Sequence, residues 1–252
     1  MERPIIEVTG LTMGYGGIAL LKDVTFQVMP GEVFVILGGS GSGKSTLLKH
    51  MIGLYEPMAG HVLIHGKDIV TAQGRERREI LRSFGVTYQA GALFGSMTIL
   101  ENVCLPLEEF TGLPKDAREA VARLKLKLVG LAGSEDKLPS ELSGGMQKRA
   151  AIARAMALDP ALLFLDEPQA GLDPVTSAGL DELILTLSKN FGITFVMVSH
   201  ELASVFAVAD RAIMLDGKAM GIIAQGPPKD LRDHDADPRV RQFFNREANR
   251  PT

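Results

Sequence analysis

Residues 34–49 read FVILGGSGSGKSTLLK, an apolar run that breaks into a glycine-rich turn and then becomes apolar again. The run from Val33 to Leu37 is predicted to be a buried strand, and the segment from Ser45 to Gly53 a helix that stops at glycine. The turn between them fits the pattern G-x-x-x-x-G-K-S/T, which requires this order of strand, turn and helix. The chain must therefore fold so that a strand leads into a helix through a glycine loop.

This glycine loop has the composition of a phosphate-binding site. Its glycines let successive backbone N–H groups face one point, and the helix N-terminus adds partial positive charge there. Lys44 can reach the β- and γ-phosphates, and Ser45 supplies a hydroxyl for Mg²⁺. A plain strand-to-helix turn would not explain the lysine and the serine together, so the loop predicts bound nucleoside triphosphate. The loop residues are Gly38, Gly39, Ser40, Gly41, Ser42, Gly43, Lys44, Ser45 and Thr46.

A second apolar run ends in two carboxylates, Asp166 and Glu167. One acidic residue at this place would be an ordinary strand end or a helix cap, but two together suit hydrolysis. Asp166 can bind Mg²⁺, directly or through water, and Glu167 can polarise the attacking water. The pair predicts a nucleotide-hydrolysing site at the carboxyl end of a strand.

The remaining segments indicate a parallel sheet with a helical insertion. Short strands are predicted over the first forty residues, and helix from about Met97 to Leu158. Apolar strands at 161–166 and 193–199 flank a predicted helix at 174–190, which is the spacing of a βαβ unit. The tail from about Pro227 is expected to be a surface appendage.

Composition excludes several classes of protein. Hydrophobic residues make up 46% of the 252 residues, enough for a sizeable core, and the net charge of −3 argues against a broad nucleic-acid face. No apolar run approaches the roughly 18 residues of a membrane span, and the first residues lack a secretion signal, so a cytosolic location is expected. The single cysteine, Cys104, is expected to be an apolar filler.

The segment LSGGMQKR at 142–149 completes a resemblance. Together with the glycine loop and Asp166-Glu167, it resembles the ATP-binding cassette of ABC transporters. The resemblance implies an α/β fold with a P-loop, RecA-like parallel-sheet core, an N-terminal antiparallel β subdomain and an inserted α-helical subdomain. The implied boundaries are 1–88 and 161–226 for the core with its β subdomain, 89–160 for the helical subdomain and 227–252 for the tail.

The same resemblance assigns further roles to single residues. Gln89 resembles the glutamine that senses Mg²⁺ and water, and His200 the switch histidine that contacts the γ-phosphate. Tyr15 resembles the aromatic residue on which adenine stacks, although a tyrosine that covers the β lobe is the plain alternative. Asp173 resembles the aspartate that couples two sites. The signature residues Ser143, Gly144 and Gly145 would face the glycine loop of a second cassette, so the resemblance implies a homodimer with ATP between its copies.

Three positions depart from the pattern of the family. Met146 stands where glutamine is usual, and Ala170 takes a usual serine position. Gln169 is an uncommon choice two residues after Glu167 and could alter the geometry of the base. None of the three removes a phosphate or metal ligand. The departures are therefore expected to affect the rate of ATP hydrolysis more than whether the protein hydrolyses ATP.

Two stretches carry a finer resemblance. Residues 89–103, QAGALFGSMTILENV, and 237–244, DPRVRQFF, resemble the cassette subunit of bacterial lipid transporters of the maintenance-of-lipid-asymmetry type. That implies phospholipid cargo, an integral-membrane permease, a mammalian-cell-entry (MCE) domain protein and, in some relatives, a small STAS-type regulatory protein. The chain would sit at the cytoplasmic face of the inner membrane, held through its permease.

Two surfaces follow from this finer resemblance. Leu93, Phe94 and Met97 would form an exposed patch for the permease, unless they pack the helical lobe against the core. Phe243 and Phe244 would anchor the tail on a partner cassette.

Two other functions stay open at the level of sequence. The cargo could be a small polar solute, with a different permease and a solute-binding protein. A non-transport clamp acting on ribosomes or DNA is a poor fit, because such proteins usually carry two cassettes or long coiled coils.

Overall fold

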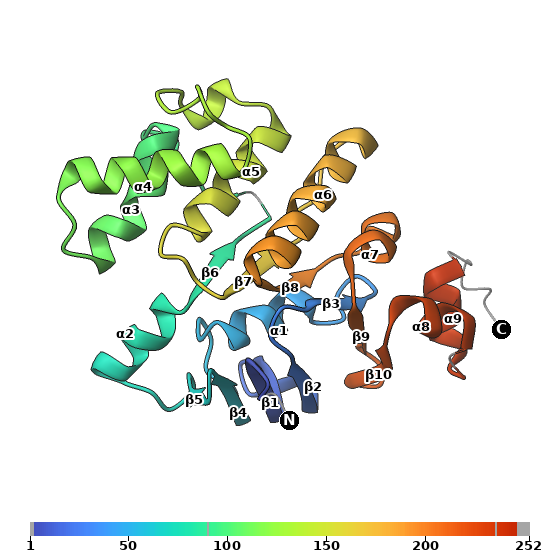
Figure 1. The fold of residues 1–252 in the computed structure, drawn as a ribbon. Coiled ribbons are helices and arrows are strands. Elements are labelled where there is room, and N and C mark those ends of the chain that lie inside the picture. The colour runs from blue at the N-terminus through green and yellow to red at the C-terminus, as the bar shows by residue number, and fades with distance from the viewer. Residues whose placement is uncertain (1–2, 90, 235, 246–252) are drawn as a thin grey trace.

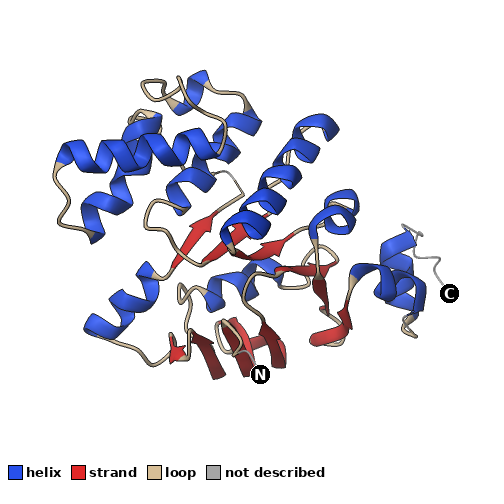
Figure 2. Ribbon diagram, in the orientation of Figure 1, coloured by secondary structure: helices blue, strands red, loops and turns tan. Residues whose placement is uncertain are grey.

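The computed structural model describes residues 3–89, 91–234 and 236–245. Within these residues the strands form a six-stranded sheet and a four-stranded sheet, shown in red in Figure 2. The larger sheet runs in the order β10-β9-β3-β8-β7-β6 and the smaller in the order β2-β1-β4-β5. The expected parallel-sheet core beside an antiparallel β-sheet is confirmed.

The larger sheet carries the site. Its strands are β3 (Val33–Gly38), β6 (Phe84–Thr87), β7 (Leu162–Asp166), β8 (Thr194–Val198), β9 (Arg211–Asp216) and β10 (Gly221–Gly226). All pairs are parallel except β9 with β10. Every residue of β3, β7 and β8 is buried, which explains why these strands are continuous apolar runs instead of alternating ones.

The antiparallel sheet consists of β1 (Ile6–Tyr15), β2 (Ile18–Val28), β4 (Ala59–Ile64) and β5 (Lys67–Asp68). The turn between β1 and β2 is made by two glycines with φ of 57° and 82°, a conformation that favours glycine. Tyr15 therefore stands at the tip of a hairpin.

Helices connect and cover these sheets (Figure 1). They are α1 (Lys44–Met51), α2 (Gly74–Arg82), α3 (Ile99–Phe110), α4 (Lys115–Leu128), α5 (Gly144–Ala155), α6 (Pro174–Phe191), α7 (Leu202–Val208), α8 (Pro228–His234) and α9 (Pro238–Asn245), with a 3₁₀ turn at Pro139–Glu141. Helices α3, α4 and α5 pack on one another and form the predicted helical region. None of the helices in the described residues is both long enough and apolar enough to cross a bilayer.

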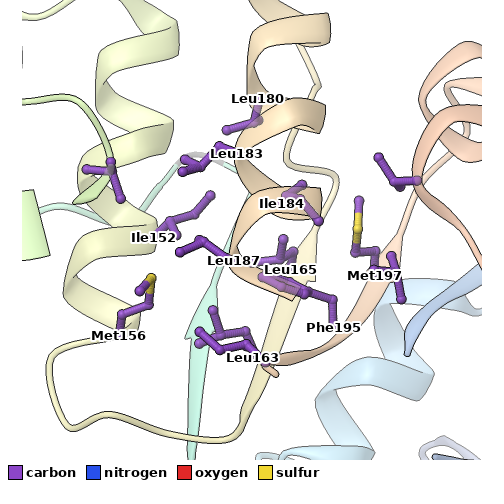
Figure 3. Close-up of a cluster of buried hydrophobic side chains, with 14 of the residues drawn as sticks. Ile152, Met156, Leu163, Leu165, Leu180, Leu183, Ile184, Leu187, Phe195 and Met197 are labelled. Atoms are coloured by element: carbon purple, nitrogen blue, oxygen red, sulfur yellow. The ribbon is translucent and has the colours of Figure 1, made fainter. Parts of the chain in front are cut away.

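The core lies on both faces of the larger sheet. Val33, Val35 and Leu37 of β3 belong to one cluster of buried side chains, whereas Phe34 and Ile36 belong to the other. Figure 3 shows part of the first cluster, in which side chains of α5 and α6 meet those of β7 and β8. The alternation of β3 therefore fixes helices on both sides of the strand that carries the glycine loop.

The tail corrects one expectation. Its described residues, 227–234 and 236–245, include α8 and α9, and they are not a mere surface appendage, because Leu231, Val240 and Phe244 are buried in the core cluster. The ring of Phe244 lies 5.6 Å from that of Phe206 on α7, centre to centre. Val240 and Phe244 are one helical turn apart, so α9 buries a stripe of its surface. Phe244 is 5% exposed and cannot be the free anchor predicted for it.

Candidate functional site

Three segments with predicted site residues leave the larger sheet at one edge. Ile36 of β3 and Asp166 of β7 are both opposite Val198 of β8. The carboxyl ends of the three parallel strands therefore lie level. This places the glycine loop after β3, Glu167 after β7 and His200 after β8 at the edge where open α/β sheets bind ligands.

The glycine loop cannot accept other residues at its start. Gly38 has a φ of 147°, and a Cβ there would lie 2.5 Å from the main-chain oxygen of Leu215 and from Oγ of Ser42. Gly43, with a φ of 96°, is the N-cap of α1. The loop thus passes straight from β3 into a helix N-terminus, where anions are favoured.

Lys44, the first residue of α1, is buried beneath this loop. Its Nζ donates to the main-chain oxygens of Gly38 and Gly39, each at 2.9 Å. Burial lowers the pKa of the Lys44 ammonium, and the nearby carboxylates of Glu167 and Asp166 oppose that shift. Lys44 therefore places a cation inside the loop.

Ser45 and Asp166 form a hydrogen-bonded pair next to Lys44. Oγ of Ser45 donates to Oδ1 of Asp166 at 3.0 Å. Burial raises the pKa of the Asp166 carboxyl, against the lowering effect of the Ser45 bond. A hydroxyl and a carboxylate are oxygen ligands of the kind that Mg²⁺ prefers, so this pair fits a magnesium ion.

The fit leaves several ligand positions to be filled by other groups. The described residues contain no group of three or more His, Cys, Asp or Glu side chains able to hold a metal ion. Magnesium commonly binds through one or two carboxylates, with the substrate phosphates and water supplying the rest. The pair therefore suits a metal that arrives with a phosphate ligand.

Glu167 and His200 form a second pair at the same edge. Nδ1 of His200 lies 3.0 Å from Oε1 of Glu167. The backbone of Glu167 has a φ of 49°, in the left-handed region, and its N–H donates to the main-chain oxygen of Val198 at 2.9 Å. A non-glycine residue adopts this strained conformation only when its surroundings hold it, so the carboxylate is fixed by its neighbours.

Tyr15 borders the loop from the antiparallel sheet. Its hydroxyl lies 3.1 Å from Oγ1 of Thr46, and its ring meets Tyr55 edge-on at 5.7 Å. His50 of α1 in turn packs against Tyr55 at 5.7 Å. The exposed Tyr15 ring is thus supported from behind, as a stacking surface for a base requires.

Gln89 follows β6 and is held by the helix that bears the LSGG segment. Its main-chain oxygen accepts from Nζ of Lys148 on α5. Further along, Arg154 of α5 donates to the oxygens of Gly91 at 3.1 Å and Ala92 at 2.7 Å. Helix α5 therefore fixes the chain on both sides of the turn after Gln89.

The patch predicted after Gln89 is only partly exposed. Phe94 is 50% exposed, with the guanidinium of Arg154 6.0 Å from its ring centre. Leu93 and Met97 are half-buried, and Leu93 packs against the core. The packing alternative therefore holds for Leu93, while Phe94 presents an apolar surface.

A cavity of about 720 Å³ collects most of the predicted residues. It is lined by Leu20, Gly38, Gly39, Ser40, Gly41, Gly43, Lys44, Ser45, Thr46, Gln89, Glu167, His200 and Phe243. Sequence reasoning missed Leu20, which carries no motif, and assigned Phe243 to a dimer contact. No motif near Phe243 indicates that its side chain lines this cavity.

The signature residues stand apart from this cavity. Ser143, Gly144, Gly145 and Asp173 are not among the described residues that line it. Ser143 caps α5, with Oγ accepting from the N–H of Met146 at 3.3 Å. Asp173 caps α6, with Oδ1 accepting from the N–H groups of Val175 and Thr176 at 3.0 Å. Within one chain, Ser143, Gly144 and Asp173 are exposed at helix starts, and Gly145 is buried.

Comparison with known families and proteins adds independent findings. The family model described as "ABC transporter" matches residues 21–170. The probable ribonucleotide transport ATP-binding protein mkl of Mycobacterium leprae is 44% identical over 240 residues, which are 95% of this chain and 68% of that protein. The intermembrane phospholipid transport system ATP-binding protein MlaF of Haemophilus influenzae is 39% identical over 252 residues, 100% of this chain and 94% of that protein.

A solved structure agrees with these similarities. The dimeric, post-hydrolysis state of the ATP-binding cassette MJ0796, bound to ADP and Pi, superposes with a TM-score of 0.79 and 31% sequence identity. The match covers 88% of this chain and 98% of that one.

Proposed function

This chain belongs to the ABC transporter family and is an ATPase, and we propose that it drives phospholipid transport through a separate membrane permease. The observation that carries the proposal is that the glycine loop, Ser45, Glu167 and His200 line one cavity, with Asp166 bonded to Ser45. The cargo is proposed from the similarity to MlaF, which extends over the whole chain.

ATP is the substrate of this site. The loop from Gly38 to Thr46 receives the phosphates, Lys44 supplies the buried cation, and the supported ring of Tyr15 stacks on adenine. Ser45, Asp166 and Gln89 are the residues that would hold Mg²⁺. When bound, the ion neutralises charge on the β- and γ-phosphate oxygens.

Hydrolysis requires a base and little covalent chemistry from the protein. Glu167 is placed to accept a proton from the attacking water, since its carboxylate lines the cavity and its backbone is fixed. His200 holds Oε1 of Glu167 and faces the same space, where it would contact the γ-phosphate. Lys44 would stabilise the charge that develops on the transferred phosphoryl group.

A second copy of the chain would complete the site. Ser143 and Gly144 are exposed at the start of α5, with Gly145 buried behind them, and this helix start is suited to an anion. Among the described residues, none of the three borders this chain's own cavity. Two copies facing each other would bring each signature segment to the other's ATP, and Asp173 would couple the two sites. With subdomain boundaries at residues 88–89 and 160–161, the core of each copy would supply the glycine loop and its helical subdomain would supply the signature segment.

The permease would dock near Phe94. A hollow of about 540 Å³ lies between α3 and α4, lined by Met97, Leu100, Cys104 and charged side chains. Docking there would hold the chain at the cytoplasmic face of the inner membrane. An MCE-domain protein and a STAS-type regulatory protein are further proposed partners, and nucleic acid is not.

A second cargo is supported by one observation. The mycobacterial relative of higher identity is named a ribonucleotide transport protein, although this chain spans only about two thirds of its length. A ribonucleotide is a polar solute, so this candidate predicts a permease with a solute-binding protein in place of an MCE protein.

Affinity purification of the tagged chain from gently solubilised host membranes tests the proposal. Mass spectrometry should find a multispanning permease, an MCE-domain protein and phospholipid. Recovery of a permease with a solute-binding protein would favour the polar cargo. Recovery of ribosomes or DNA without any membrane protein would contradict the proposed transport function.

A further inference from the structure

A buried hydrogen bond ties down the loop that carries Glu167. Gln169 lies two residues beyond Glu167, between the end of β7 and the start of α6. Its Nε2 donates to Oδ1 of Asp181 at 2.8 Å. Asp181 lies on the second turn of α6, and the two residues are 5% and 6% exposed. The loop is therefore anchored on α6 away from solvent.

The same carboxylate reaches the segment that follows His200. Burial raises the pKa of the Asp181 carboxyl, and the nearby hydroxyl of Ser204 on α7 lowers it. Oγ of Ser204 lies 3.3 Å from Oγ of Ser177, a residue of α6, so Ser204 is hydrogen-bonded to the same helix that carries Asp181. Ser204 is buried and stands four residues after His200. The network therefore joins the Glu167 loop to the His200 segment.

These two segments are connected twice. At the cavity, Nδ1 of His200 meets Oε1 of Glu167 at 3.0 Å. The second connection is buried and passes through α6, where Asp181 accepts from Gln169 and Ser177 bonds Ser204. Two separate connections between the same segments restrict their relative movement more than either one alone.

The backbone around Glu167 needs such support. Its φ of 49° is left-handed, a conformation disfavoured for a residue with a Cβ. The turn is closed by bonds from the N–H of Ala170 to the oxygen of Glu167 and from the N–H of Leu172 to the oxygen of Gln169, both at 3.1 Å. Gln169 is the side chain that fastens this turn to the body of the protein.

The other half of the Gln169 amide points to a role besides stability. Its Oε1 is buried and, among the described residues, finds no hydrogen-bond donor. Leaving a buried acceptor unpaired is unfavourable, and an apolar side chain of similar size would avoid that cost. The benefit of glutamine here must therefore come from its N–H donor and what that donor holds.

We propose that Gln169 is a positioning residue for ATP hydrolysis, whose bond to Asp181 sets Glu167 relative to His200. This inference rests on the proposed roles of Glu167 and His200. Gln169 is not among the described residues that line the cavity, so its effect should appear in the hydrolytic step and not in ATP binding.

The first variant is Gln169→Leu in the full-length protein, with Gln225→Leu on the exposed edge of β10 as the matched control. Steady-state phosphate release should show kcat reduced about 10- to 100-fold, because small misplacements of a reacting group cost that much. The KM for ATP and the affinity for nucleotide should change less than about 2-fold, since the glycine loop is untouched. Wild-type kcat, or equal losses in kcat and affinity, would overturn the proposal.

A swapped pair separates positioning from general damage. Gln169→Glu alone sets two carboxylates against each other and should lower kcat at least as far as Gln169→Leu. Adding Asp181→Asn restores the hydrogen bond with its direction reversed, because the amide at position 181 now donates to the carboxylate at position 169. The kcat should then return to within about 3-fold of wild type. A double variant as slow as Gln169→Glu alone would contradict the inference, and this comparison also decides the matter if Gln169→Leu does not fold.

A second cycle asks whether Gln169 acts through Glu167. In a Glu167→Gln background, Gln169→Leu should cause no further loss of turnover, because the group that it positions is already gone. Additive losses would show that Gln169 acts elsewhere. The proposed function fails instead if the wild type does not hydrolyse ATP or if Glu167→Gln keeps normal turnover, so the two failures are distinguishable.

Discussion

His200 and Glu167 stand 33 residues apart in the chain, yet Nδ1 of one lies 3.0 Å from Oε1 of the other. They meet because β7 and β8 are adjacent parallel strands that end level, with Asp166 opposite Val198. The contact leaves the carboxylate at the mouth of the nucleotide cavity, with its backbone held by Val198. This geometry suits the proposed role of Glu167 as the base, because the direction of its carboxylate is set before substrate binds.

Replacement of the base should separate binding from chemistry. Glu167→Gln keeps the shape of the side chain and can still bond His200, so ATP affinity should stay within about 3-fold of wild type. Hydrolysis should fall by a factor on the order of 10² to 10⁴, the usual contribution of a general base. Nucleotide titration and phosphate release measure the two quantities, and near-normal turnover would refute the assigned role.

Removal of the loop cation should affect both steps. Lys44→Ala deletes the ammonium that bonds the oxygens of Gly38 and Gly39, and with it a phosphate contact. Nucleotide binding and turnover should both drop at least about 10-fold, since a charge-assisted phosphate contact commonly contributes that much. Lys189→Ala, which removes an exposed lysine in the last turn of α6, is the control. Wild-type ATP affinity in Lys44→Ala would overturn the assignment of Lys44.

Local signals explain why so much of the fold followed from sequence. The helix predicted from Ser45 to Gly53 runs from Lys44 to Met51, and the one predicted at 174–190 runs from Pro174 to Phe191. Each has a start signal that works over a few residues, the glycine loop for α1 and the Asp173 cap followed by proline for α6. The sheet edge then follows from parallel pairing, which brought Asp166, Glu167 and His200 together.

Features that depend on packing between distant segments were out of reach. Nothing near Phe243 in sequence says that it lines the cavity, because its position is set by α9 burying Phe244 against Phe206. The bond between Gln169 and Asp181 depends likewise on how the loop after β7 folds over α6. Such contacts are decided by tertiary packing, which short-range patterns do not encode.

A buried histidine should make the stability of the protein depend on pH. His50 is 1% exposed, and its Nδ1 donates to the main-chain oxygen of Thr46 at 2.8 Å. Burial lowers the pKa of His50 below its ordinary value of 6.5, against the raising effects of the main chain at Thr46 and Glu56. Below about pH 6.5 the unfolded chain takes up a proton that the folded chain resists, so stability falls as the pH falls.

His50→Gln should reduce this acid sensitivity. The variant cannot take up a proton in the unfolded state at this position, so its melting temperature should fall less than that of the wild type between about pH 7.5 and 5.5. His234→Gln, an exposed histidine on α8, is the control and should keep the wild-type slope. Equal slopes for all three proteins would show that His50 does not contribute.

The two phenylalanines of the tail should have different roles, and point variants can separate them. Deleting the residues after Asp237 would remove Val240 and Phe244 from the core together with any contact to a second copy, so a truncation alone is ambiguous. Phe244→Ala should lower the free energy of unfolding by about 3 kcal/mol, as expected for a buried aromatic ring.

Phe243→Ala is the sharper test of the proposed tail contact between two copies. Phe243 is half-buried and borders the nucleotide cavity, so the substitution should shift the melting temperature less than Phe244→Ala does. In a Glu167→Gln background, where ATP is retained, it should weaken ATP-dependent dimerisation about 10-fold if the ring contacts the second cassette. Sedimentation velocity with and without ATP measures this. An unchanged dimer fraction would assign Phe243 to the cavity of its own chain, because a ring that does not contact the partner cannot alter how tightly the partner binds.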